Sequence, residues 1–509
     1  MASLSQPGVT AVRWSVLATA LRFALQLGAQ VWLARMLGPE VFGLFAIGLV
    51  LLTFANFVSG FGFSWSLLQR QDLREEDIRF AWTWQVLAGL VAAALMAGLA
   101  PWLATLLNTP SATDVIRWLS LACLFQAAAA PSTYLLQRDL NFRAVGLVQV
   151  GSYAAGYVAV GVPLAWMGAG VQALVAAWLV QTGVALAVSL ALRPHPVRPL
   201  LWYGGAAHVM RTGRAVFFTN LVNWALASLD RLLIARLLST ASLGLYNVAY
   251  NLATVPNTLL LGALQPAFMA AGARLQDDRA RLGAAYVQML ATLLVLVLPA
   301  FIALALLAPD IVRLLYGPAW DGAGQALRVL FAFMPAFVIW GLSTPVLWNT
   351  DRPQHEFALQ LPLIPLGALA FWLAAPHGLM AAAFTAGSLL LLRALVLVAA
   401  ALRALELSAS VLAPHALRGA VLAVLTGLLV SLGQQWGHGQ PLAALAALAG
   451  GAALPLASAT ALLWFRPQWC PPLLGEPCWR MVLRFAPRLE RNLLRPRPPK
   501  SGPLNHRTP

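Results

Sequence analysis

Charged side chains are scarce in this sequence. Of its 509 residues only 10% are Asp, Glu, Lys or Arg, whereas 60% are hydrophobic. Because a soluble domain carries roughly 25% charged residues, a soluble globular protein is excluded. The mean hydropathy of +0.75 and the repeated apolar runs, each close to the ~20 residues that cross a bilayer as a helix, indicate an integral membrane protein.

Cysteine and histidine are too few and too scattered for a disulfide framework or a metal centre. Cys123 lies in an apolar run, Cys470 and Cys478 lie near the C-terminus, and no C-x-x-C pair occurs. The seven histidines show no H-E-x-x-H or other metal-ligand spacing. The phosphate-binding motif G-x-x-x-x-G-K-[ST] is also absent, so the chain is not expected to hydrolyse ATP. We therefore expect no cofactor and no metal.

Long apolar segments predict fourteen transmembrane helices, which would leave almost nothing for a soluble domain. The first segment is too long for a cleaved signal peptide and has no clean cleavage site. The predicted fold class is therefore an all-α, polytopic membrane protein. The helices are expected at residues 12–37, 41–66, 80–107, 113–136, 145–167, 169–191, 214–238, 241–271, 284–308, 323–348, 357–376, 378–402, 415–436 and 441–465.

Arginine distinguishes the two sides of the predicted bundle, because short cytoplasmic connections collect Arg and Lys. The connections after even-numbered helices contain Arg70, Arg74, Arg79, Arg138, Arg143, Arg193, Arg198, Arg211, Arg214, Arg274, Arg279, Arg281, Arg352, Arg403 and Arg418. The alternate connections contain only Arg35, Arg117, Arg236, Arg313 and Arg328. Both termini are therefore expected in the cytoplasm.

Contact with anionic membrane lipid can explain the net charge of +16. Basic residues line the predicted inner face and recur in the Pro-rich segment 466–509, where arginines from Arg480 to Arg495 have helical spacing. We expect this segment to lie on anionic lipid as an interfacial helix. Pro487 interrupts the pattern, and a plain membrane-hugging end is the alternative. No nucleic-acid partner is expected.

Two halves of the sequence repeat each other. The segment Leu33–Leu37 and the Gly43-Leu44-Phe45 that follows it reappear as Ile234–Leu238 and Gly244-Leu245-Tyr246. Two more pairs match in the same order, Ala100-Pro101 with Ala308-Pro309 and Arg117-Trp118-Leu119 with Arg328-Val329-Leu330. Collinear matches of this kind indicate an internal duplication.

The duplication predicts the domain organisation. Each repeat would hold six helices, and because this number is even, both halves would enter the membrane the same way round. Two parallel bundles suit alternating access, in which one half rocks against the other; a larger helical bundle without transport is the alternative. The predicted units are a first six-helix bundle at 1–192, a cytoplasmic linker at 193–213, a second bundle at 214–403, two additional helices at 404–465 and the basic tail at 466–509.

Polar residues inside the predicted helices mark a candidate substrate site, because charge in the hydrocarbon region is expensive. Guanidinium groups bind phosphate in a forked geometry and amides pair with sugar hydroxyls, so the expected cargo is anionic and rich in hydroxyls. Interhelical ion pairs and snorkelling side chains are the alternatives, and for Arg393 snorkelling is favoured. The candidate substrate-binding residues are Arg22, Gln26, Asn223, Asp230, Arg231, Asn247 and Asn251.

Two further roles are assigned to charged residues. Asp230 is the most deeply placed acid, with the others expected in loops, tails or helix ends; it could carry a proton, help to bind sodium, or act as a fixed counter-ion for Arg231. Arg35 and Arg236 match across the repeat at the outer ends of the first and seventh helices. We expect them to form an outer gate, with interfacial anchoring as the alternative.

The same segments resemble the Wzx-type polysaccharide flippases of the multidrug/oligosaccharidyl-lipid/polysaccharide exporter superfamily. The resemblance is carried by Leu33–Phe45, Asp230–Leu238 and Leu243–Ala249. It implies a transporter, not an enzyme, that moves an undecaprenyl-diphosphate-linked oligosaccharide from the inner to the outer leaflet of the bacterial inner membrane, for O-antigen, capsule or exopolysaccharide assembly. The implied partners are the lipid-linked oligosaccharide, membrane lipids and other polysaccharide assembly proteins.

Two other functions remain open. A cation-coupled multidrug exporter would need acids in its cavity, where this chain has arginines. A membrane-bound glycan polymerase or ligase would need acids or histidines in sizeable outer loops, and the predicted outer connections are short apart from residues 310–321.

Overall fold

The computed structural model describes residues 6–60, 63, 67, 73–139, 141–204, 206–273, 275, 278–350 and 353–436, and for some helical residues only the backbone. All regular structure in these ranges is helical, with no strand. The predicted all-α fold class is therefore confirmed. The expected helix at 441–465 and the basic tail at 466–509 lie outside the described residues.

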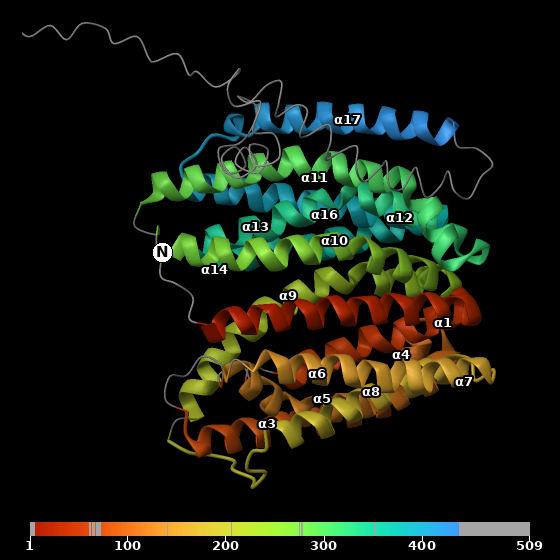
Figure 1. Cartoon of the computed structure of the whole chain (residues 1–509), viewed down its shortest axis with the longest axis vertical. Coiled ribbons are helices and arrows are strands. Elements are labelled where there is room, and N and C mark those ends of the chain that lie inside the picture. Colours follow the sequence, from red (N-terminus) through yellow and green to blue (C-terminus); the bar gives the residue numbers. More distant parts are fainter. Residues whose placement is uncertain are drawn as a thin grey trace, which may run out of the picture.

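The first half of the chain is built around a long, interrupted helix (Figure 1). Helix α1, Gln6–Gly60, contains the first predicted span and most of the second. Gly38, with a φ of 73°, interrupts its helical backbone and is followed by Pro39; glycine adopts this left-handed conformation without strain. The other helices are α3 (Glu75–Gly98), α4 (Ala100–Leu106), α5 (Thr113–Arg138), α6 (Phe142–Tyr153), α7 (Val162–Trp166) and α8 (Val171–Leu192), with a π-helical segment at Ala154–Gly161 between α6 and α7.

The second half contains more helix breaks, two of which lie at prolines. The helices are α9 (Ala206–Leu237), α10 (Thr240–Ala273), α11 (Arg279–Tyr316), α12 (Asp321–Phe333), α13 (Pro335–Asn349), α14 (Pro353–Gln360), α15 (Leu363–Ala374), α16 (Gly378–Ala404) and α17 (Ala413–Trp436). A bend of 42° separates α12 from α13 at Pro335, and Pro362 lies between α14 and α15. Proline has no N–H and its ring clashes with the preceding turn, which explains both breaks.

The helices agree with the predicted spans in position. Within the described residues, each span from 12–37 to 415–436 coincides with a helix or with consecutive helical segments, although α9 begins inside the expected linker at 193–213. Among the described residues, eight helical segments are long and apolar enough to cross a membrane, and the bent pair α12 and α13 makes a ninth. The total of fourteen stays a prediction.

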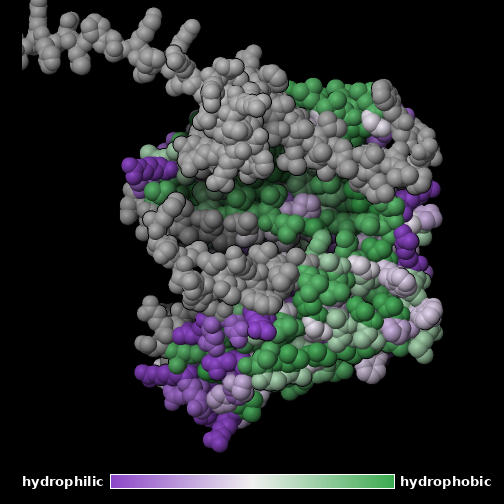
Figure 2. Space-filling view, viewed as in Figure 1, coloured by the Kyte–Doolittle hydropathy of each residue, from purple (hydrophilic) through white to green (hydrophobic). Residues whose placement is uncertain are grey.

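The two halves lie side by side along the longest axis of the molecule (Figure 1). The helices of the first half pack on one another, those of the second half do likewise, and α1 packs against α10 between them. Large apolar side chains such as Trp102, Trp166 and Leu428 are exposed. Figure 2 shows hydrophobic residues over the middle of the visible face and hydrophilic ones toward its left and right edges, where the helices of Figure 1 end. An apolar outer surface over helices is what a bilayer requires.

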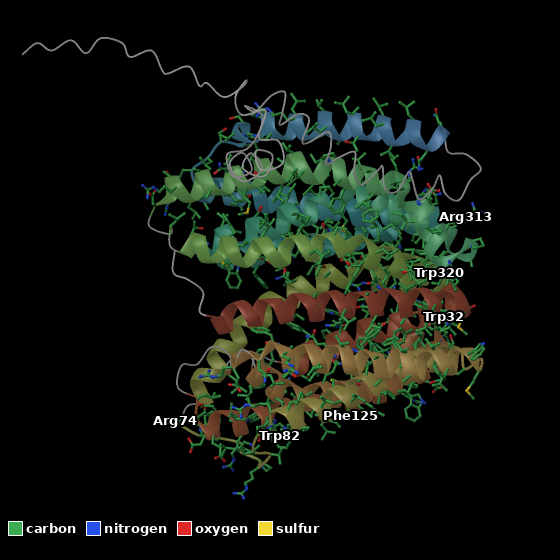
Figure 3. All side chains as sticks on the ribbon, in the orientation of Figure 1. Trp32, Arg74, Trp82, Phe125, Arg313 and Trp320 are labelled. Atoms are coloured by element: carbon green, nitrogen blue, oxygen red, sulfur yellow. The ribbon has the colours of Figure 1, made fainter. Side chains whose placement is uncertain are left out.

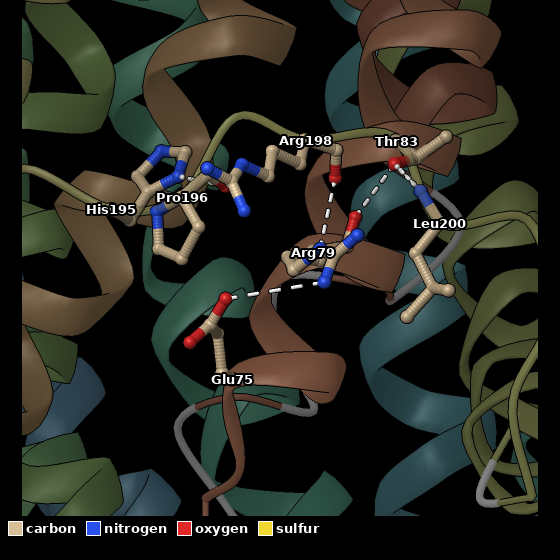
Figure 4. A network of polar contacts seen from close by, with 7 residues as sticks. All are labelled: Glu75, Arg79, Thr83, His195, Pro196, Arg198 and Leu200. Carbon is tan, nitrogen blue, oxygen red and sulfur yellow. Dashed lines mark hydrogen bonds and ion pairs between the residues drawn. The ribbon is translucent and has the colours of Figure 1, made fainter.

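The segment that joins the halves is packed against the first half (Figure 4). Arg79 on α3 donates from Nε to the carbonyl oxygen of Arg198 at 3.1 Å. The backbone N–H of Leu200 donates to the hydroxyl of Thr83 at 2.9 Å. These hydrogen bonds therefore attach the connecting segment 193–204 to helix α3.

His195 belongs to this connecting segment. Burial lowers the pKa of its imidazole, a hydrogen bond with the carbonyl of Pro196 raises it, and the charge of Arg193 lowers it. The ring is therefore neutral at pH 7. Because the unfolded chain takes up the proton first, acidification below about pH 6.5 is expected to weaken the docking of this segment.

Candidate functional site

Two glycines of the repeated segments bring the halves into backbone contact. A Cβ added to Gly43 on α1 would collide with the carbonyl oxygen of Thr240, and one added to Gly244 on α10 would collide with that of Pro39. Pro39 and Thr240 each lie one helical turn before the glycine of their own repeat. The contact is therefore reciprocal, as across a two-fold axis. We call it the glycine seam.

Hydrogen bonds join the halves beside the glycine seam. Arg35 donates from Nε to the carbonyl of Leu315 at 2.7 Å and from Nη2 to that of Leu314 at 2.6 Å. Both acceptors belong to the C-terminal turn of α11, where a cation is favoured. The amide of Asn108 donates to the carbonyl of Arg236 at 3.2 Å. Of the predicted gate pair, Arg35 thus crosses between the halves with its side chain and Arg236 with its backbone.

A buried tryptophan completes the contact at this end of the molecule. Trp320 donates from Nε1 to the carbonyl of Ala34 at 3.2 Å, and its ring meets that of Phe42 edge-on, with centroids 5.5 Å apart. Figure 3 shows Trp320 and Arg313 at the end opposite to Arg74. The seam, the Arg35 contacts and Trp320 therefore close the molecule at one end.

The candidate residues of the first half lie beside α6. Arg22 is half-buried on α1 and interacts electrostatically with Tyr153 on α6. The hydroxyl of Tyr153 donates to the carbonyl of Gln26 at 3.5 Å, while the Gln26 side chain is exposed. Tyr153 also stacks on Tyr157, with ring centroids 4.7 Å apart. This part of α1 therefore presents the cation of Arg22 near aromatic rings and contacts Tyr153 through the backbone of Gln26.

A cavity of about 850 Å³, including space open to solvent, lies within the second half. Helices α9, α10, α12, α13, α15 and α16 surround it. The volume that water-sized molecules can enter is about 190 Å³, which is below the ~300–1,000 Å³ of typical small-molecule sites. Most of the lining is apolar or aromatic, and the charged side chains that line it are Asp230 and Arg393.

Asp230 is 7% exposed and its carboxylate is well partnered. The hydroxyl of Tyr246 donates to Oδ2 at 2.6 Å, and the backbone N–H of Arg231 donates to Oδ1 at 2.7 Å. The Arg231 guanidinium lies 3.7 Å from Oδ1 and 4.9 Å from the centroid of the Tyr250 ring. A buried carboxylate needs such partners, and their number favours the fixed counter-ion over an ion carrier.

Arg393 on α16 is 6% exposed and does not snorkel. Its Nε donates to Oε1 of Gln360 on α14 at 2.6 Å, and its Nη2 donates to Oδ1 of Asn223 on α9 at 2.6 Å. Its guanidinium also stacks on the indole of Trp340 on α13, 3.8 Å from the ring centroid. The network therefore ties together four helices of the second half.

Glu356 extends the same network. It lies in the first turn of α14, one of the helix ends where the acids other than Asp230 are expected, and it is only 1% exposed. The carboxylate accepts from Trp348 Nε1 at 2.8 Å, from Gln360 Nε2 at 3.0 Å and from the Thr344 hydroxyl at 3.4 Å. Asp230 is therefore not the only acid buried within the helices.

The structure divides the predicted substrate residues into separate groups. Arg22 and Gln26 lie on α1, whereas Asn223, Asp230 and Arg231 lie on α9 around the cavity and its network. Substrate contact by these residues stays a prediction.

The two asparagines predicted on α10 have a different setting. Asn247 is half-buried and Asn251 exposed. Neither lines the cavity, and neither side chain forms a hydrogen bond within the described ranges. They lie next in sequence to Tyr246 and Tyr250, which do line it.

Sequence reasoning missed several residues around the cavity. Tyr246 and Tyr250, and likewise Glu356 and Gln360, are spaced four apart and so share a helix face. That spacing was a usable signal. No sequence signal could have predicted the stacking of Arg393 on Trp340, because the two residues are distant in sequence and meet only in the folded chain.

Comparison with known families supports the resemblance seen in the sequence. The family described as polysaccharide biosynthesis protein matches residues 32–325, which is more than half of the chain. The chain belongs to this family. The predicted kinship with polysaccharide exporters is therefore confirmed.

Curated relatives agree with the family. The chain is 27% identical over 334 residues to the lipopolysaccharide biosynthesis protein WzxC of Escherichia coli K12, covering 64% of this chain and 67% of that one. It is 27% identical over 362 residues to the succinoglycan biosynthesis transport protein ExoT of Rhizobium meliloti, covering 71% and 70%. Both relatives are bacterial. Together with the apolar helices described above, they support a multi-pass bacterial membrane protein.

A solved structure extends the likeness to the fold. The lipid II flippase MurJ in an inward closed conformation aligns with a TM-score of 0.71 at 13% identity, over 89% of this chain and 99% of that one. At this identity the similarity concerns the fold alone. The family member thus shares its helical architecture with a flippase of known structure.

Proposed function

We propose that this protein is a flippase that moves an undecaprenyl-diphosphate-linked oligosaccharide from the inner to the outer leaflet of the bacterial inner membrane. Membership of the polysaccharide biosynthesis family carries the proposal. The family and the fold support a transporter instead of an enzyme. O-antigen, capsule or exopolysaccharide assembly would consume the translocated glycan.

Alternating access is the proposed mechanism. Residues 1–192 and 214–403 would act as two bodies that rock about the glycine seam. The reciprocal contacts of Gly43 and Gly244 support this division, because each half offers the other the same surface. In the proposed orientation, with both termini in the cytoplasm, the seam is the outer gate and Arg35 and Arg236 belong to it.

The cargo is proposed to contact charged side chains of both halves. Arg22 on α1 and Arg231 on α9 are each only partly buried, so their guanidinium groups can reach a diphosphate head. Forked guanidinium contacts suit phosphate oxygens. The amides of Gln26, Asn247 and Asn251 are proposed to meet sugar hydroxyls.

Complementation of a deletion strain tests the function. Loss of the gene should stop surface glycan assembly and leave lipid-linked oligosaccharide on the inner leaflet. Arg22→Ala and Arg231→Lys, which keeps a cation beside Asp230 but loses the forked geometry, should each lower export strongly while folded protein stays at the normal level in the membrane. Arg279→Ala, at an exposed ion pair with Glu406, is the matched control and should export normally. Normal surface glycan in the deletion strain would refute the proposal.

A further inference from the structure

We propose that Arg393 forms an oxyanion-binding site inside the second half, where it holds an anionic group of the transported glycan. This inference rests on the proposed function and names a contact that the sequence analysis did not. The shared chemistry is a pair of oxygen atoms carrying negative charge. Its source is either the diphosphate of the lipid carrier or the carboxylate of an acidic sugar.

The guanidinium of Arg393 is held in one position before any ligand arrives. Gln360 fixes Nε, Asn223 fixes Nη2, and the indole of Trp340 supports the guanidinium plane. These three partners come from three different helices. A donor held in this way loses little conformational entropy on binding, which favours affinity.

One edge of this guanidinium remains available. In the described part of the chain, no hydrogen bond from Nη1 of Arg393 is formed, and the residue lines the cavity. Much of the lining around it is aromatic, including Tyr250, Phe333, Phe337 and Phe371. Such surroundings lower the local dielectric and strengthen a charged hydrogen bond.

The carboxylates near this site form no direct ion pair with Arg393 among the described residues, although the charge of Glu356 acts on its guanidinium from a greater distance. Asp230, on the cavity wall, is already partnered by Arg231 and Tyr246. Glu356 is separated from Arg393 by the amide of Gln360, which donates to Glu356 and accepts from Arg393. No carboxylate among the described residues lies within ion-pair distance of Arg393. An incoming oxyanion would supply an anionic partner in direct contact with the guanidinium.

Asn223→Asp provides the sharpest test, because it keeps the shape and the acceptor oxygen while placing a carboxylate on Arg393. If Arg393 binds an oxyanion, this carboxylate should displace it and weaken binding by about tenfold or more. A purely structural Arg393 predicts the opposite pattern, with a stable fold and unchanged ligand binding. Asn56→Asp, in the first half and bonded to Gln126, adds the same charge and is the matched control.

Thermal unfolding of the purified full-length protein in detergent reports the binding. The probes are inorganic pyrophosphate and D-glucuronate, each titrated to tens of millimolar. Wild type and Asn56→Asp should be stabilised by at least one probe, and Asn223→Asp much less. Stabilisation by pyrophosphate alone assigns the site to the carrier diphosphate, and by glucuronate alone to an acidic sugar.

Two results would overturn the proposal: neither probe stabilises the wild type, or Asn223→Asp binds the probe as the wild type does. If Asn223→Asp does not fold, Arg393→Lys replaces it, since lysine keeps the charge and loses the forked geometry. Unchanged binding in that variant would also overturn the site. Complementation is read separately: normal surface glycan without the gene refutes the flippase function, whereas a rescue with unaltered probe binding in Asn223→Asp refutes only the Arg393 site.

Discussion

The two halves of the molecule share their contact surface but differ in what they bury. At the seam, Gly43 and Gly244 make the same contact from opposite sides. Deeper in the helices the repeat diverges. Asp230 and Tyr246 form a buried hydrogen bond, whereas the matching positions in the first half are the buried, apolar Ala29 and Phe45.

Arg22 and Asn223 show the same divergence. They occupy equivalent positions in the repeat, but Arg22 is a half-buried cation on α1, and Asn223 is an acceptor for the cation of Arg393. The two halves therefore keep the same glycine contact, because each half contributes one side of the seam. The charged side chains, in contrast, differ between the halves, as the proposed transport of one asymmetric cargo predicts.

Replacing Asp230 by the residue of the first half should have the largest effect. Asp230→Ala removes the carboxylate partner of Arg231 and leaves the buried hydroxyl of Tyr246 without its acceptor. We expect the free energy of unfolding to fall by about 3 kcal/mol, measured by denaturant or thermal unfolding in detergent. Asp114→Ala removes an exposed ion pair with Arg117 and should change stability by less than about 0.5 kcal/mol. Equal losses in the two variants would contradict the asymmetry.

Alanine at either glycine of the seam should lower the free energy of unfolding by less than Asp230→Ala does. The loss should be equal for the two glycines. Gly43→Ala and Gly244→Ala each force a methyl group against a backbone carbonyl, so each should cost about 2 kcal/mol and reduce glycan export. Gly151→Ala on α6 is the control, because its Cβ would meet no atom within 4 Å and alanine is the better helix former. If only one seam variant loses stability, the contact is not reciprocal.

Substituting the two arginines beside the glycine seam should give a modest difference in stability. Arg35→Ala deletes two hydrogen bonds to the end of α11 and should cost about 1 kcal/mol. Arg236→Ala leaves the backbone carbonyl that accepts from Asn108 in place, so little change in unfolding temperature is expected. Similar losses in both variants would show that the Arg236 side chain also contributes to the contact between the halves.

Much of the fold could be read from the sequence, because transmembrane helices are long apolar segments whose backbone groups are satisfied within the segment itself. The helix ends were harder. The expected span begins at residue 357, next to Glu356, whereas α14 begins at Pro353. Its polar first turn is buried by the neighbouring helices, and hydropathy along the chain contains no information on those neighbours.

The candidate site was only partly predictable. Asp230 and Arg231 stood out because charge is rare inside membrane helices. Arg393 was expected to snorkel, whereas its partners come from α9, α13 and α14. Those partners are distant in sequence, so no local sequence pattern could predict them.

The sequence by itself determined that the chain is a helical membrane protein, that it is duplicated, and which family it belongs to. These properties follow from composition and from matches along the chain, which need no knowledge of packing. Only the tertiary structure decided that Gly43 meets Thr240, that Glu356 is buried, and that Arg393 lines a cavity with one edge unpartnered by any described residue. Such contacts depend on the positions of several helices at once, and a linear pattern does not contain them.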